Sequence, residues 1–198
     1  NGLEGAAALF NDNLLCLDEV SECDPHEVGG VVYSISNGIG KQRADRGGGA
    51  RSVMRWKCFI LSNGERTIET SIREGGRAAK AGQSVRLLDI PVARKFGAFD
   101  ELHGLTSGAA LSDRIKSITA NHYGHAGRAF LEKASNDGRD FRNYLDQFKN
   151  TTQFKSGDDG GQFKRAAARF ALIALAGELA IEYRLLPGLS EGMALDAA

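Results

Sequence analysis

The sequence predicts an α/β fold with a core of parallel strands followed by an α-helical lid. Short, continuous apolar runs of the kind that form buried parallel strands occur in the first half of the chain, and polar residues follow them. Apolar residues with helical spacing lie between these runs and take over after about residue 105. Strands first and helices afterwards are typical of a core that carries a helical appendage.

Composition limits the classes of partner. The 198 residues suit one domain, or a core with a small appendage. Basic and acidic residues balance at 25 each, so any basic surface must be local. Three cysteines in no metal-binding pattern favour a reducing compartment, and no apolar stretch reaches the roughly 20 residues of a membrane span. We expect a cytoplasmic protein without a membrane partner.

Both ends of the chain interrupt a predicted helix. Gly5 to Phe10 has the character of the last turns of one helix, and Ser190 to Leu195 begins another that stops at Ala198. We therefore expect the chain to be a fragment.

The first predicted strand covers Asn13 to Leu17 and ends in Asp18-Glu19. A helix follows, because Asp24-Pro25 supplies a cap and a residue suited to the first helical position. This helix ends near Asn37-Gly38, whose residues tolerate positive φ. Functional residues of parallel sheets usually lie at strand ends of this kind.

Residues 38–55 have the composition of an exposed loop or hairpin. Glycines alternate there with basic residues, namely Gly38, Gly40, Gly47, Gly48 and Gly49 with Lys41, Arg43, Arg46, Arg51 and Arg55. The triple glycine is not a phosphate loop, because no Gly-Lys-Ser/Thr follows it.

A second strand is predicted over Trp56 to Leu61, closed by the polar residues Ser62 to Glu65. A helix over Ile68 to Ala81 comes next, with Gly82 as its C-terminal stop. A third strand covers Val85 to Pro91 and is ended by its proline. We place the core at residues 1–104.

The lid is predicted at residues 105–198. Helical spacing runs over Leu111 to His122 and again over Phe130 to Phe148, with a break near Asn136 to Gly138. The last long helix extends from Phe163 to about Tyr183, and one of two aspartates in the polar loop before it could be its cap. The alanines in its middle suggest close packing on neighbouring helices.

Asp18 and Glu19 give the sharpest local indication of chemistry. An Asp at the end of a buried strand can hold Mg²⁺ through its water shell, and a neighbouring Glu can orient or deprotonate the water that attacks a γ-phosphate. The alternative is a strand edge with two solvated acids.

The motifs resemble the C-terminal part of the ATPase domain in a family of phage- and plasmid-encoded proteins described as superfamily II helicases and their inactivated derivatives. The resemblance covers nearly the whole chain and keeps the order of the motifs. The matching segments are Asn1 to Gly5, Leu14 to Glu19, Asn37 to Arg46, Leu61 to Glu65, Ala81 to Pro91 and Arg169 to Ala171.

That family is in turn similar to the AAA+ branch of P-loop helicases that contains the minichromosome-maintenance motors. The resemblance implies a partial P-loop NTPase (AAA+-like) core that uses ATP and Mg²⁺, binds DNA and forms a homo-oligomer, a hexamer when intact. Asp18 and Glu19 then occupy Walker B, with Asp18 toward the metal. Lys41, Arg43 and Arg46 occupy a DNA-facing hairpin, where cations suit contact with phosphates. A solvated glycine-rich loop is the alternative for the hairpin.

The same resemblance gives roles to polar residues farther along. Asn63 matches sensor 1, with Ser62 as the neighbouring candidate, unless the two form an ordinary turn. Arg86 matches an arginine finger that would reach the γ-phosphate of the next subunit; a surface ion pair is its alternative. Arg165 and Arg169 are candidates for sensor 2, or for a solvated helix face.

The sequence departs from the family in lacking a Walker A loop before Walker B. Without its lysine and backbone N–H groups, we expect this chain alone to bind nucleotide poorly. Two hypotheses follow. The chain is a fragment of a mobile-element helicase-type ATPase that couples ATP hydrolysis to DNA translocation or unwinding, or it is a catalytically inactive DNA- or protein-binding module derived from one.

Overall fold

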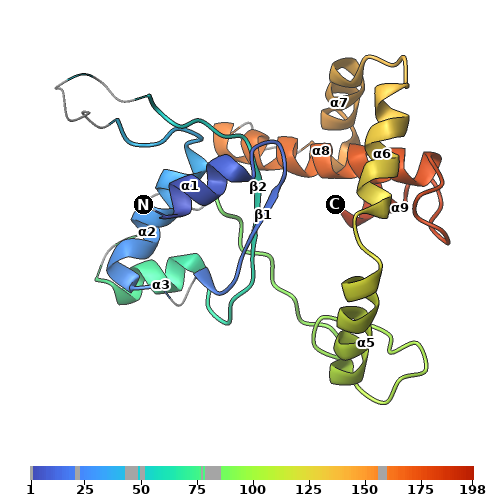
Figure 1. The fold of residues 1–198 in the computed structure, drawn as a ribbon, viewed down its shortest axis with the longest axis horizontal. Coiled ribbons are helices and arrows are strands. Elements are labelled where there is room, and N and C mark those ends of the chain that lie inside the picture. Colours follow the sequence, from blue (N-terminus) through green and yellow to red (C-terminus); the bar gives the residue numbers. More distant parts are fainter. Residues whose placement is uncertain are drawn as a thin grey trace. The chain divides into compact units, whose positions relative to one another are not determined.

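The computed structural model describes residues 2–20, 23–42, 49, 52–76, 78, 86–155 and 160–198 (Figure 1). The chain divides into two compact units, Asn1–Asp89 and Ile90–Ala198. The first unit contains strands and helices, and the second contains helices. The predicted α/β class is therefore correct, while the boundary after residue 104 stays a prediction.

Two strands form the sheet of the first unit. β1 (Leu14–Leu17) pairs in parallel with β2 (Phe59–Ser62), in a register that sets Leu14 beside Phe59 and Leu17 beside Ser62. The first predicted strand is confirmed. The second begins three residues later than predicted, because the backbone N–H of Trp56 bonds instead to the carbonyl of Gly38 at 3.0 Å.

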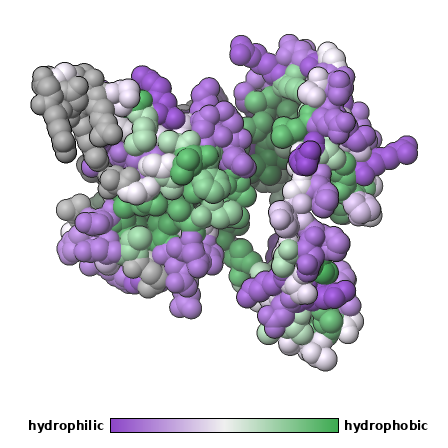
Figure 2. Space-filling model, in the orientation of Figure 1, coloured by the Kyte–Doolittle hydropathy of each residue, from purple (hydrophilic) through white to green (hydrophobic). Residues whose placement is uncertain are grey.

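One face of the sheet is buried. Leu15 packs with Ala7 of α1 (Gly2–Leu9), with Ile35 and with Trp56. The opposite face is exposed and carries the side chains of Leu14, Cys16, Phe59 and Leu61. Apolar surface is visible over this unit in Figure 2.

α2 (Pro25–Ser36) begins and ends as the sequence predicts. The Asp24 side chain accepts a hydrogen bond from the backbone N–H of His26 at 2.9 Å, and Pro25 opens the helix. Asn37 ends it, followed by Gly38 at a φ of 69°. Val28 and Val32 of α2 pack against Ile68 and Ile72 of α3.

α3 (Ile68–Glu74) is shorter than the predicted helix over Ile68 to Ala81. Thr67 caps its start, and Gly75 ends it. The next residue, Gly76, has a φ of 71°, a left-handed conformation that stops a helix. The predicted stop at Gly82 lies outside the described residues.

The third predicted strand does not form in its described part, residues 86–91. Arg86 stands in a turn, Leu87 packs against the cluster that contains Val20 and Val28, and an Asp89 carboxylate oxygen accepts from the backbone N–H of Ile68 at 3.3 Å. These contacts attach residues 87–89 to the start of α3 and to the cluster beside it. The segment therefore packs against a helix and does not pair with the sheet.

The second unit is built from helices that end near the predicted breaks. α6 ends before Asn136 and α7 begins after Asp140, which confirms the break near Asn136 to Gly138. The predicted cap of the last long helix, Asp158 or Asp159, lies outside the described residues. The elements are α5 (Gly108–Asn121), α6 (His125–Ser135), α7 (Phe141–Lys149), η2 (Thr152–Phe154), α8 (Gly161–Glu182) and α9 (Met193–Ala197).

α8 is the central helix of this unit. Its Ala171 and Ala174 are buried with Phe154, which agrees with the close packing that the alanines predict. The Glu178 carboxylate accepts from the backbone N–H groups of Gly192, Ala194 and Leu195 at 2.9 to 3.0 Å, which holds the start of α9. No helix in the described ranges is long and apolar enough to cross a membrane.

An ion-pair network joins the turn between α6 and α7 to the end of α8. Arg139 binds Asp137 through its side chain and contacts Glu182 at 2.7 Å, and the Tyr183 hydroxyl donates to Asp137 at 2.6 Å. These donors, Arg139 first, hold the pKa of the Asp137 carboxyl well below its usual range. The network is satisfied internally, and it fixes the helices to one another.

Candidate functional site at the carboxyl ends of the strands

Parallel pairing brings the polar ends of β1 and β2 to the same edge of the sheet. Leu17 lies beside Ser62 in the register, so Asp18-Glu19 follows one strand where Ser62-Asn63 closes the other. The Asp18, Glu19 and Asn63 side chains are exposed there, and Ser62 is half-buried. Four residues that the sequence assigns to one site are therefore neighbours in space.

Hydrogen bonds connect the two strand ends directly. The backbone N–H of Glu19 donates to the Asn63 side-chain oxygen Oδ1 at 3.0 Å, and the next one, of Val20, donates to the Ser62 hydroxyl at 3.3 Å. The Ser62 hydroxyl donates to the carbonyl of Asn63 at 3.0 Å. We call this set of bonds the strand-end clamp.

The strand-end clamp holds Glu19 in an unusual backbone conformation. Its φ is 47°, in the left-handed region that residues with a side chain seldom adopt. Such a conformation costs roughly 1–2 kcal/mol and persists where the surroundings determine it. Asp12, His103 and Arg184 also have a positive φ, so the conformation of Glu19 describes the local backbone and does not by itself assign a function.

Glycine at position 19 should stabilise the chain. Because glycine adopts positive φ freely, Glu19→Gly should raise the free energy of unfolding by about 0.5 to 1 kcal/mol after its greater entropy when unfolded is counted. Urea unfolding followed by Trp56 fluorescence measures the change, since Trp56 is the one tryptophan of the chain and is buried in the first unit. Glu65→Gly is the control and should be neutral or destabilising; an equal response at both positions would contradict the strain at Glu19.

The oxygen donors at this edge suit a hard cation such as Mg²⁺, whose remaining ligands would be water and phosphate oxygens. It offers two carboxylates, an amide and a hydroxyl. Mg²⁺ is commonly held by one or two carboxylates, with waters and phosphate oxygens as the other ligands. Within the described part of the chain, no group of three or more His, Cys, Asp or Glu side chains could hold a metal ion by itself.

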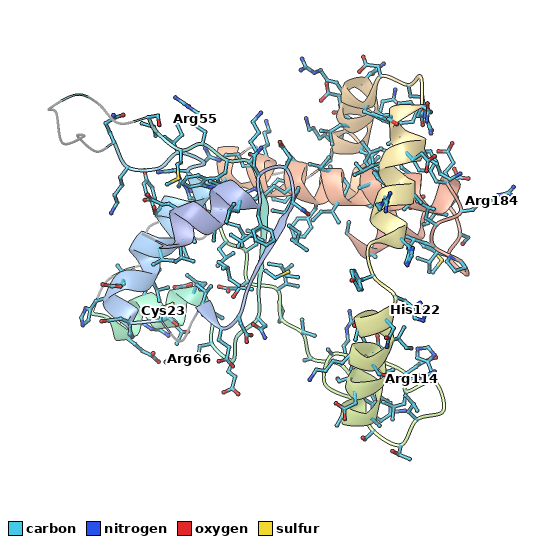
Figure 3. The ribbon with its side chains drawn as sticks, in the orientation of Figure 1. Cys23, Arg55, Arg66, Arg114, His122 and Arg184 are labelled. Atoms are coloured by element: carbon cyan, nitrogen blue, oxygen red, sulfur yellow. The ribbon has the colours of Figure 1, made fainter. Side chains whose placement is uncertain are left out.

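Backbone pairing joins the two ends of the segment 38–55, which we call the basic loop, and we call these paired ends its root. Ile39 and Arg55 form an antiparallel bridge, and the backbone N–H of Gly40 donates to the carbonyl of Met54 at 2.8 Å. Lys41 is exposed just beyond this bridge, and Arg55 lies at the base of the loop (Figure 3). Arg43 and Arg46, the other two predicted DNA contacts, lie outside the described residues.

Arg86 is not at the strand-end site. Its guanidinium lies 4.6 Å from the centre of the Tyr33 ring, and it donates to the Asn37 side chain at 3.5 Å. Both partners belong to the C-terminal end of α2, whereas Asp18-Glu19 comes before the start of that helix. Arg165 and Arg169 belong to α8 of the second unit, where Arg165 is exposed and Arg169 half-buried.

The structure adds a buried carboxylate that sequence reasoning gave no role. Glu4 of α1 is 3% exposed and accepts from the Ser34 hydroxyl of α2 at 3.2 Å. A Cβ atom added at Gly40 would lie 3.5 Å from its oxygen Oε2. Glu4 therefore connects two helices beside the root of the basic loop. A lone acid in an alanine-rich helix gives no signal of burial.

One family model matches part of the chain. It is described as a domain of unknown function (DUF927), and the match covers residues 1–55. The chain is thus similar to that family over α1, β1, α2 and the basic loop, a part that includes Asp18 and Glu19. No curated protein and no solved structure matches the chain.

Proposed function

We propose that this chain is the Walker B and sensor 1 part of a helicase-type P-loop ATPase of a phage or plasmid, which couples ATP hydrolysis to DNA translocation or unwinding in the cytoplasm. One observation carries the proposal: Glu19 and Asn63, on neighbouring parallel strands, are joined by the 3.0 Å bond from backbone N–H to side-chain oxygen. The resemblance to AAA+ helicases implies that an acid and an amide at adjacent strand ends position the attacking water and the γ-phosphate.

Asp18 and Glu19 take separate roles in the proposal. Asp18 is the residue that would hold Mg²⁺, and the bound ion would neutralise charge on the phosphates of ATP. Glu19 accepts a proton from the attacking water. The left-handed backbone at Glu19 and the hydrogen bond of its N–H fix the direction of its Cα–Cβ bond. This limits the directions in which the Glu19 carboxylate can point.

Asn63 supplies a donor. Its Oδ1 accepts from the Glu19 backbone, so the amide's two N–H groups are what it can offer to a phosphate oxygen or to the attacking water. Ser62 supports the same edge through its bond to Val20. The clamp thus couples the positions of the base and of the donor, as a reaction that depends on their alignment demands.

The arginines act on charge from other positions in the proposed motor. Arg86 serves the nucleotide of a neighbouring subunit in a homo-oligomer, a hexamer, a role that requires its guanidinium to leave Tyr33 and Asn37 of its own chain. Arg165 and Arg169 contact nucleotide from α8. Lys41, Arg43 and Arg46 contact the phosphates of DNA.

The proposal requires a phosphate loop, and these 198 residues contain no Gly-Lys-Ser/Thr. A gene that encodes such a loop upstream of Asn1 supports the motor. A gene whose translation begins near Asn1 overturns it and favours the second candidate, an inactive DNA- or protein-binding module. The exposed cations Lys41 and Arg55 at the root of the basic loop favour that candidate, since they need no nucleotide to bind DNA.

The substitution Asn63→Asp tests whether the Asn63 side chain acts on the nucleotide or only joins the two strand ends. Aspartate keeps the oxygen that accepts from Glu19 but lacks the N–H donors and adds negative charge near the phosphates. In the protein with its phosphate loop, steady-state ATP hydrolysis should fall about 100- to 1,000-fold, as expected for the loss of one positioned donor. Unfolding by urea should change little.

Asn11→Asp is the matched control. Asn11 also accepts a backbone N–H with its side-chain oxygen, from Lys57 at 2.8 Å, but beyond the opposite ends of the strands. Hydrolysis should not change in this variant. Full activity of Asn63→Asp would show that Asn63 only clamps the strands, and the sensor assignment would be lost.

A further inference from the structure

We infer that Arg55 pairs with Lys41 to form a phosphate-binding surface at the root of the basic loop, one that holds the sugar–phosphate backbone of DNA. The inference rests on the DNA contact in the proposed function and adds a residue from the returning strand of the loop. It also gives that contact a rigid foundation.

The paired backbone segments 38–41 and 54–56 form a short two-stranded ribbon. Its pairing geometry sets Lys41 and Arg55 on one face. The bonds from Gly40 to Met54 and from Trp56 to Gly38 flank the Ile39–Arg55 pair, so this is a non-hydrogen-bonded pair whose side chains lie close on the same face. Alternation along the strand returns Lys41, two residues after Ile39, to that face. The backbone pairing is a single bridge at Ile39 and Arg55, and this alternation makes Lys41 the expected diagonal neighbour of Arg55.

Burial distinguishes the two faces. Lys41 and Arg55 are exposed, and Ile39 between them is 47% exposed. On the other face Gly40 is buried and Trp56 is 3% exposed, while Met54, farther along the loop, is 46% exposed. The ribbon therefore presents a face of two cations and one apolar side chain to solvent.

The ribbon is anchored to the α/β unit. The Trp56 indole N–H donates to the carbonyl of Ile35 in α2 at 2.7 Å, and the buried Glu4 lies beside Gly40 on the inner face. Because the backbone at Arg55 is fixed, binding of a phosphate there has to order the arginine side chain and not the chain that carries it.

The chemistry of Arg55 suits phosphate. A guanidinium binds phosphate oxygens through a planar fork of N–H donors, and an ammonium such as that of Lys41 acts as a point charge. Neither reads base identity from this position, so the surface should bind DNA of any sequence, with an affinity that falls as salt rises.

Binding of a fluorescein-labelled oligonucleotide to the full chain, followed by fluorescence anisotropy at several salt concentrations, tests the inference. Arg55→Ala should weaken binding roughly fivefold and reduce the slope of log affinity against log salt by about 0.7 to 0.9, the value for one lost phosphate contact. Arg55→Lys should keep the slope. Arg73→Ala removes an exposed arginine from α3 of the same unit and should change neither quantity.

The outcomes distinguish this inference from the proposed function. If Lys41→Ala weakens binding while Arg55→Ala equals Arg73→Ala, the role of Arg55 is overturned and the loop remains the DNA contact. If the unaltered chain does not bind the oligonucleotide, the inference and the DNA contact of the proposed function both fail. Thermal unfolding of each variant, followed by Trp56 fluorescence, checks that the ribbon remains folded.

Discussion

Glu19→Gln in the protein that carries a phosphate loop should lower the rate of ATP hydrolysis about a hundredfold or more, while ATP still binds. Glutamine has the size of glutamate but cannot accept a proton from the attacking water, and a positioned general base contributes roughly 10²- to 10⁴-fold. The bond to Asn63 comes from the backbone of residue 19, so the strand-end clamp is retained. The variant therefore removes the proton acceptor and keeps the hydrogen bond between the two strand ends.

Steady-state hydrolysis and binding of a fluorescent ATP analogue measure the two parts of this expectation. Glu65→Gln is the matched control, because Glu65 is an exposed acid two residues after Asn63 and should not affect turnover. Undiminished hydrolysis by Glu19→Gln would remove the Walker B assignment. Equal losses at both positions would point to a general effect of charge near this edge.

The elements that the sequence predicted well depend on local chemistry. Asp24 caps α2 and Pro25 opens it, since both effects act within one turn of helix. The apolar run of β1 is a strand for a similarly local reason. The proximity of Asp18 and Asn63 also followed, because parallel strands bring their carboxyl ends to one edge.

Contacts between distant segments decided the rest. The third predicted strand has the right composition, but its described residues pack on the start of α3 through Leu87 and Asp89. No pattern in the sequence indicates that Asn63 accepts from the Glu19 backbone or that Glu19 adopts a positive φ. Likewise, Arg86 lies on Tyr33 through a contact between residues far apart in the chain.

Gly75→Ala should lower the free energy of unfolding of the first unit by about 3 kcal/mol, the upper end of the usual cost of overpacking. The added Cβ atom would lie 2.6 Å from the carbonyl oxygen of Pro25 and 2.7 Å from its carbon. These are backbone atoms, so relief requires α2 and α3 to move apart. That movement would loosen Val28 and Ile72, which are packed together between the helices.

Gly30→Ala is the control, and it should change the free energy of unfolding in the opposite direction from Gly75→Ala. Gly30 is exposed on α2, and a Cβ atom there meets nothing within 4 Å, so alanine should stabilise the helix by about 0.5 to 1 kcal/mol. Urea unfolding followed by Trp56 fluorescence should separate the two variants in opposite directions. If Gly75→Ala also stabilised the chain, the close contact of α3 with Pro25 would be wrong. Because Pro25 opens the helix that follows Asp18-Glu19, the placement of the candidate site would then lose one of its supports.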